Sequence, residues 1–116
     1  MIQRLHIKDF AIIDEIDINF NTGLTVITGE TGSGKSIIIE ALSVAAGKKT
    51  DKMMIKSGSQ NCVVDLDFNN YSYRRIINKS GRSKSYVDET PITAIALQKE
   101  FTTKIDFMVS MTSNLF

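Results

Sequence analysis

A glycine-rich octapeptide at residues 29–36, Gly-Glu-Thr-Gly-Ser-Gly-Lys-Ser, constrains this chain more than any other feature. It fits the pattern G-x-x-x-x-G-K-[ST], in which several backbone N–H groups converge on a chain of phosphates. A Cβ atom would obstruct that hollow, which explains why glycine occurs at Gly29, Gly32 and Gly34. The pattern therefore predicts a nucleotide site between a strand and a helix.

The last two residues of the octapeptide supply the charge and a metal ligand. Lys35 is predicted to reach the β- and γ-phosphates, and the hydroxyl of Ser36 to complete the shell of a Mg²⁺ ion. The N-terminus of the following helix adds unpaired amides and a positive dipole end. ATP with Mg²⁺ is the predicted ligand. The predicted nucleotide-binding residues are Gly29, Glu30, Thr31, Gly32, Ser33, Gly34, Lys35 and Ser36.

The flanks of the octapeptide match the setting that the pattern requires. Residues 24–28, Leu-Thr-Val-Ile-Thr, form a short β-branched run that predicts a buried strand. Residues 36–46 are mostly compatible with a helix, buried on most sides, that ends at Gly47. The fold class is therefore α/β, of the P-loop NTPase type. A glycine-rich surface turn before an unrelated helix is the alternative.

Composition sets outer limits on this assignment. The 116 residues suffice for one globular domain but are few for a P-loop ATPase, whose parallel sheet usually has five or more strands. A net charge of +1 indicates nothing about a nucleic-acid partner. The single cysteine, Cys62, excludes an internal disulfide and is expected to pack as a small apolar residue. No signal peptide or apolar span is visible, so we expect a cytoplasmic protein without a membrane partner.

Alternating apolar and polar residues predict further strands around this core. The first is expected to be an edge or half-exposed strand, and Asn69-Asn70 is a hairpin signal between two others. A solvated loop is expected at 48–52 and another loop at 88–91. Strands are predicted over 1–10, 16–20, 62–68 and 71–77, and a helix over 92–101.

Three polar residues on these strands invite a catalytic interpretation. His6 has no nucleophile or metal partner near it in sequence, so a solvent-side strand residue is the simpler interpretation. Asp65 and Asp67 follow too short an apolar run to be the Mg²⁺ carboxylates of a P-loop enzyme, and alternation places both on the polar face of a hairpin. We therefore expect solvated strand residues at all three positions.

A basic run from Arg74 to Lys84 contains no acidic residue and has tyrosines around it. Basic side chains neutralise backbone phosphates and aromatic rings stack on bases, so a DNA contact is one interpretation. A solvated hairpin with a turn at 79–83 is the other. The candidate DNA-contacting residues are Arg74, Arg75 and Arg82.

Three stretches together resemble the start of the RecN family, bacterial ATPases of DNA double-strand-break repair related to SMC proteins. They are 7–15 (IKDFAIIDE), 23–36 (GLTVITGETGSGKS) and 81–87 (GRSKSYV). The resemblance implies the N-terminal lobe, over 1–106, of an ABC-type ATPase head. A C-terminal lobe beyond a coiled coil would carry the signature motif and the Mg²⁺ carboxylates. It also implies DNA, a second head in a homodimer and association with the nucleoid.

The tail at 107–116 departs from that resemblance. RecN relatives have a run similar to I-H-G-Q-H there, which includes a glutamine near Mg²⁺ and the attacking water. A permitted set of codons for the tail, shifted by one base, encodes His-Gly-Gln-His, so we expect a single-base frameshift after Asp106. We therefore assign no residue of this chain to hydrolysis.

Two other functional classes stay open from the sequence. A small stand-alone P-loop kinase would need an acceptor site and a second Mg²⁺ carboxylate, for which no set of residues is evident. A truncated fragment without catalytic function is the second alternative. The favoured interpretation is an ATP-binding lobe that hydrolyses ATP only together with the C-terminal lobe of its head.

Overall fold

The computed structural model describes residues 2–20 and 32–102, with the backbone alone at 32–35. The predicted strand at 24–28, the first part of the octapeptide and the tail at 107–116 lie outside the described residues, and these expectations stay predictions. The elements are β1 (Ile2–Phe10), β2 (Ile13–Asn19), α1 (Gly32–Ala45), the short 3₁₀ helix η2 (Lys52–Met54), β3 (Asn61–Phe68), β4 (Tyr71–Asn78), β5 (Ser83–Val87), β6 (Thr90–Ile92) and α2 (Ala94–Thr102).

The six strands form one antiparallel sheet in the order β2-β1-β3-β4-β5-β6. The prediction that β1 is half-exposed is confirmed, since Leu5 and Ile7 are buried while Lys8 is exposed. The edge position is wrong, because β1 lies between β2 and β3. Alternation along one strand shows which face is buried but not which neighbours pair with it.

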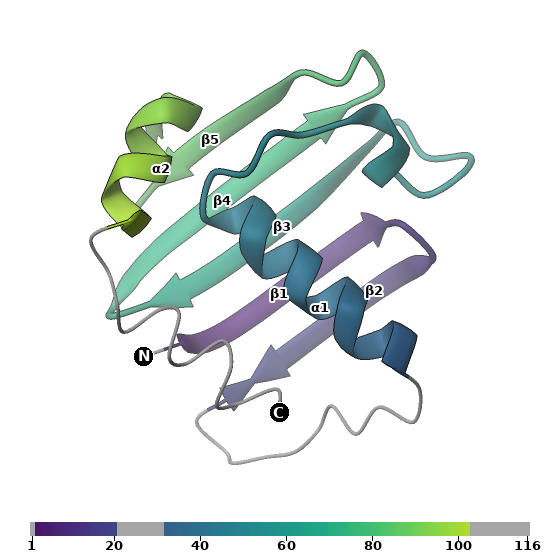
Figure 1. Cartoon of the computed structure of the whole chain (residues 1–116), viewed down its shortest axis with the longest axis horizontal. Helices are drawn as coiled ribbons and strands as arrows, with labels where there is room; N and C mark the ends of the chain where they lie inside the picture. Colours follow the sequence, from purple (N-terminus) through teal and green to yellow (C-terminus); the bar gives the residue numbers. More distant parts are fainter. Residues whose placement is uncertain (1, 21–31, 103–116) are drawn as a thin grey trace.

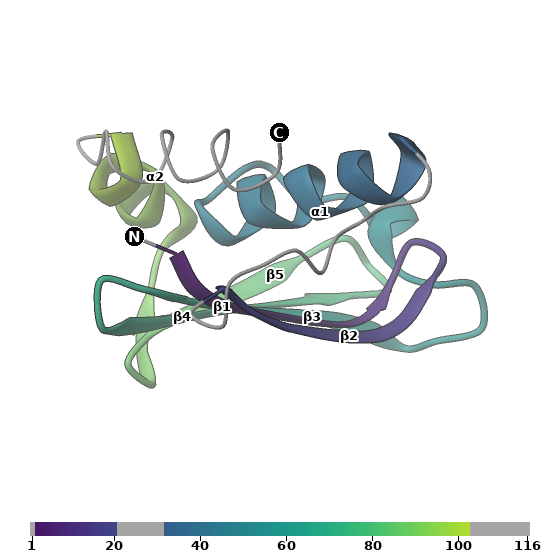
Figure 2. The same cartoon turned by 90° about the horizontal axis from the view of Figure 1, so that it is seen from below.

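Both helices cover the same face of the sheet (Figure 1, Figure 2). The alternation predicted for β3 is confirmed, because Val64, Leu66 and Phe68 point to this covered face and are fully buried, whereas Val63 is only partly buried. α1 contributes its own buried side chains, which confirms that the helix is buried on most sides. The core residues of these two elements are Ile38, Ala41, Leu42, Val44, Ala45, Cys62, Val64, Leu66 and Phe68.

Two tight turns connect neighbouring strands, one between β3 and β4 and the other between β5 and β6. Asn69 and Asn70 have φ of 51° and 67°, as expected for the predicted two-residue hairpin turn. Asp88 and Glu89 have φ of 49° and 72° and form a similar turn. The loop predicted over 88–91 is therefore only half right, because Thr90–Ile92 is strand β6. A proline is tolerated there because β6 is at the edge of the sheet.

α1 ends at Ala45, and Gly47 terminates it, as predicted, in a Schellman motif. Lys48 donates its N–H to the carbonyl of Ser43 at 3.1 Å, and Gly47 donates to Val44 at 3.0 Å. Gly47 has a φ of 106°, and a Cβ atom there would lie 2.6 Å from Cγ of Gln98 in α2. Glycine is thus required both by backbone conformation and by the close approach of α2.

α2 confirms the helix predicted near the end of the described chain, although it begins at Ala94 rather than at residue 92. Phe101 packs against two rings of the sheet, with centroid distances of 4.7 Å to Tyr73 and 5.8 Å to Phe68. Leu97 is fully buried. These contacts attach α2 to β3 and β4 on the covered face.

Candidate nucleotide-binding site and charged surfaces

The second half of the octapeptide forms the first turn of α1. The helix begins at Gly32, four residues before the predicted start, so Gly32, Ser33, Gly34, Lys35 and Ser36 all lie within it. Gly29, Glu30 and Thr31 lie outside the described residues, as do the side chains at 32–35. The structure therefore describes the backbone of residues 32–36 as the first turn of α1, and the ligand roles of the octapeptide stay predictions.

The first turn of α1 has the electrostatic character of an anion site. Its first four N–H groups have no carbonyl partner within the helix, and the helix dipole places partial positive charge there. No acidic residue occurs in that turn. A negatively charged group such as a phosphate is therefore favoured at this end.

The three arginines proposed to contact DNA lie in three different environments. Arg74 is exposed on the uncovered face of the sheet and pairs with Asp65, with Nε to Oδ1 at 2.6 Å. Arg82 is exposed in the turn between β4 and β5. Arg75 is only 1% exposed, so its inclusion in a DNA-contacting surface is a correction: the guanidinium is used inside the protein. Consecutive strand residues point to opposite faces, which separates Arg74 from Arg75.

A chain of ion pairs crosses four strands on the uncovered face. Nε2 of His6 lies 2.7 Å from Oε2 of Glu15, and Nδ1 lies 3.2 Å from Oδ2 of Asp65. Asp65 in turn pairs with Arg74 through both carboxylate oxygens. Hydrogen bonding to Glu15, with a further contribution from Asp65, raises the pKa of His6 above its ordinary 6.5. We name Glu15, His6, Asp65 and Arg74 the ion-pair ladder.

The ladder corrects the expectation of solvated side chains at His6 and Asp65. Their side chains are only 18% and 16% exposed, because each lies between partners from neighbouring strands. The predicted polar face is right for both. No signal in the local sequence could have found the partners, since His6 and Asp65 are 59 residues apart. Asp67 is also on this face and accepts a hydrogen bond from Oγ of Ser72 at 2.9 Å.

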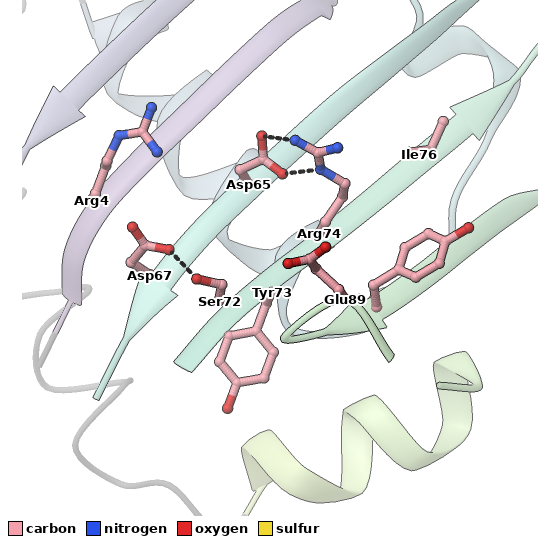
Figure 3. Close-up of a pocket in the computed structure, with 9 residues that line it drawn as sticks. Arg4, Asp65, Asp67, Ser72, Tyr73, Arg74, Ile76 and Glu89 are labelled. Atoms are coloured by element: carbon pink, nitrogen blue, oxygen red, sulfur yellow. Dashed lines mark hydrogen bonds and ion pairs between the residues drawn. The ribbon is translucent and has the colours of Figure 1, made fainter. Parts of the chain in front are cut away.

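The uncovered face has a hollow of about 590 Å³ above β1, β3 and β4 (Figure 3). Both arginines of its lining are already paired: Arg4 forms a bidentate pair with Asp17 at 2.8 and 2.9 Å, and Arg74 pairs with Asp65. No described helix begins there. The hollow consequently lacks the features of a phosphate site. Among the described residues no group of three His, Cys, Asp or Glu side chains is arranged to hold a metal ion.

Two basic segments that are distant in sequence meet beside the C-terminal end of α1. Oγ1 of Thr50 donates to the carbonyl of Gly81 at 3.2 Å, which joins the segment 48–52 to the β4–β5 turn. The basic side chains of both segments are exposed. We name this set the basic surface: Lys48, Lys49, Lys52, Lys79 and Arg82. The segment 48–52 is solvated, as expected, but its proximity to the turn could not be deduced from spacing along the chain.

Comparisons with known proteins agree with this architecture. The family model described as AAA domain matches residues 4–114. The chain is 34% identical over 122 residues to the DNA repair protein RecN of Haemophilus influenzae, covering 85% of this chain and 22% of that protein. It is 48% identical over 68 residues to RecN of Rickettsia conorii, covering 59% and 12%. A crystal structure of the SmcHead bound to the C-winged helix domain of ScpA superposes with a TM-score of 0.77 at 24% identity, covering 90% of this chain and 41% of that one.

The antiparallel sheet with α1 on one face is thus a fold that this chain shares with part of an SMC head domain. The chain belongs to the AAA domain family. The resemblance to RecN is confirmed, and the chain spans about a fifth of the length of the RecN relatives that it matches. No helix in the described ranges is long and apolar enough to cross a membrane.

Proposed function

We propose that this chain is the ATP-binding lobe of a RecN-like DNA-repair ATPase, and that it binds the phosphates of Mg²⁺–ATP through residues 29–36. The observation that carries the proposal is the direct continuation of the octapeptide into the first turn of α1. Because the amides and the dipole of that turn are directed at one place, an anion there is stabilised without any rearrangement of the helix. Lys35 and Ser36 then supply the counter-charge and a Mg²⁺ ligand.

A fluorescent ATP analogue tests this proposal by its binding to the purified chain. We expect saturable binding that requires Mg²⁺, weakens at least tenfold in Lys35→Ala and is competed by ATP and ADP but not by AMP. Lys99→Ala is the matched control, because it removes a lysine from α2 without touching the loop. Equal binding by Lys35→Ala and the unmodified chain would contradict the proposal.

For ATP turnover, we propose that the chain acts only together with a C-terminal lobe and a second head. The phosphate loop contributes contacts to the bound nucleotide, whereas hydrolysis also needs carboxylates that hold Mg²⁺ and orient water. Asp65 and Asp67 are the described carboxylates that the sequence offered for this role, but both lie on the face of the sheet opposite α1. There Asp65 contacts Arg74 and His6, and Asp67 accepts a hydrogen bond from Ser72. These pairings also argue against a stand-alone kinase.

The basic surface supports a second activity, contact with the backbone of DNA. Four of its five cations have no ion pair among the described residues, while Lys48 pairs with Glu40 at 2.8 Å. We propose that Arg82 and its neighbouring lysines neutralise phosphates without reading bases. Cations that release counterions produce binding that weakens steeply with salt.

Fluorescence anisotropy with a short duplex separates this surface from general positive charge. We expect Lys79→Ala with Arg82→Ala to weaken binding and to reduce the steepness of the salt dependence by about two phosphate contacts. Lys8→Ala with Lys99→Ala removes the same net charge elsewhere. If both double variants lose the same affinity, the basic surface is not the DNA site.

A further inference from the structure

Arg75 is a buried cation that pairs with no carboxylate in the described part of the chain. It is 1% exposed, and its side chain donates to two backbone carbonyls and one hydroxyl. Its Nε is buried and has no partner among the described residues. A buried charge without a counter-ion is costly, and an unsatisfied buried donor adds to that cost. Such a residue calls for an explanation beyond packing.

The partners of Arg75 show where its counter-charge is. Nη1 donates to the carbonyl of Val44 at 2.8 Å and to that of Lys48 at 2.6 Å, and Nη2 donates to Oγ of Ser83 at 2.7 Å. Val44 and Lys48 are at the C-terminal end of α1, where the helix dipole places partial negative charge. α1 has no basic residue of its own in its last turn. Arg75 supplies that cation from β4.

The opposite end of the same helix is the phosphate loop. α1 has 14 residues, which corresponds to about 20 Å at 1.5 Å per residue. Its first turn contains two glycines and carries Lys35, a cation that the positive end of a helix disfavours. Ile37, Ile38 and Ile39 are β-branched and add little intrinsic helix stability. Helix formation is cooperative, so the order of the first turn depends on the packing of α1 against the sheet and on the stability of its C-terminal end.

We propose that Arg75 is a positioning residue for the phosphate loop: it anchors the C-terminal end of α1 to β4 and β5, and so keeps the first turn of α1 in the conformation that binds nucleotide. The first half of this inference, that Arg75 keeps α1 ordered up to its first turn, is measurable without any nucleotide. The second half, that this order is needed to bind nucleotide, rests on the proposed function.

The planar guanidinium is needed for this role because its two terminal nitrogens reach α1 and β5 together. A lysine keeps the charge but has one nitrogen, so it cannot make the contacts to Val44, Lys48 and Ser83 in the same geometry. Arg75→Lys should therefore retain part of the effect, while Arg75→Ala loses it. The space left in Arg75→Ala is lined by the two carbonyls and the hydroxyl, a set of acceptors suited to a free guanidinium ion.

Amide hydrogen exchange along α1 tests the first half, with Phe101→Leu as control. That substitution loosens the contacts to Phe68 and Tyr73 and keeps Gln98, through which α2 hydrogen-bonds the carbonyl of Gly47 at the end of α1. In Arg75→Ala we expect exchange to rise at 43–48 and also at 32–36, and a few millimolar guanidinium, but not sodium, to reverse the rise. Should Arg75→Ala not fold, Arg75→Lys and Arg75→Gln give the same comparison. A rise confined to 43–48, or an equal rise at 32–36 in Phe101→Leu, would overturn the inference.

Binding of the fluorescent ATP analogue tests the second half at a temperature where all variants are folded. We expect about a tenfold loss of affinity in Arg75→Ala, partial rescue by guanidinium and unchanged affinity in Phe101→Leu. Unchanged affinity in Arg75→Ala would refute the positioning role. Absence of binding by the unmodified chain would instead refute the proposed function and the nucleotide half of this inference, while exchange at 32–36 still decides the role of Arg75 in α1.

Discussion

The same strands present an apolar face to the helices and a charged face to solvent. The covered face is apolar and packs under α1 and α2, and its main charged side chain, Arg75, is enclosed at the end of α1. The uncovered face carries the ion-pair ladder and the pair of Arg4 with Asp17, all within reach of water. Arg74 and Arg75 show the difference directly, because neighbouring residues of one strand serve different faces. Burial, and not charge, therefore decides what each arginine can contact.

The largest expected contrast is between Leu66 and its neighbour Asp67 in β3. Leu66 is fully buried on the covered face, so Leu66→Ala should lower the free energy of unfolding by about 2–5 kcal/mol. Asp67→Ala removes a hydrogen bond to Ser72 on the uncovered face and should lower it by about 1 kcal/mol or less. Urea unfolding measures both. Similar losses would mean that the covered face is not the core of the protein.

The two arginines give the next contrast. Arg75→Met should lower the free energy of unfolding by about 2–4 kcal/mol, because it removes the side-chain donor to the Lys48 carbonyl and the second donor to the Val44 carbonyl, which Gly47 also contacts. Arg74→Met breaks a pair whose arginine is 55% exposed and should lower it by about 1 kcal/mol or less. Thermal unfolding of the two variants at one pH makes the comparison, and a larger loss in Arg74→Met would reverse it.

The ladder makes the stability of the uncovered face depend on pH. The pKa of His6 is raised in the folded state, so its contribution is fully present below the unfolded value of about 6.5 and is lost as pH rises through the folded pKa. His6→Gln should therefore lower stability more at pH 5.5 than at pH 8.5. Urea unfolding at the two pH values measures this difference. A loss independent of pH would show that the imidazolium does not bridge Glu15 and Asp65.

The smallest expected effect concerns Cys62 on the covered face. Burial raises the pKa of its thiol to about 11, and the side chain is fully enclosed. A thiol reagent at pH 8 should leave Cys62 unmodified in the folded chain and modify it in urea. Rapid modification without urea would show that this part of the core opens readily.

Local sequence patterns predicted much of the covered face. Alternation in β3, the Asn69-Asn70 turn and Gly47 at the end of α1 are each determined by a few adjacent residues, and all three predictions are confirmed. The basic run was harder, because counting charge along the chain groups Arg74 with Arg75 although a strand directs them to opposite faces. Strand alternation was the signal that could have separated them.

Features that depend on strand order could not be predicted in the same way. The internal position of β1 and the partners of His6 arise from pairing between segments far apart in sequence. The basic surface arises likewise from the contact of Thr50 with Gly81. Such contacts leave no periodic trace in either segment, so only the arrangement of the sheet reveals them.

The most direct test of the nucleotide site is an NMR titration of the labelled chain with Mg²⁺–ATP, followed through its backbone amides. We expect the largest shift changes at residues 29–36, and we expect them to saturate and to disappear in Lys35→Ala. Little change is expected at Arg4, Asp67 and Ser72, which line the hollow on the uncovered face. Saturable changes centred on that hollow, with residues 29–36 unaffected, would show that the nucleotide does not bind at the octapeptide.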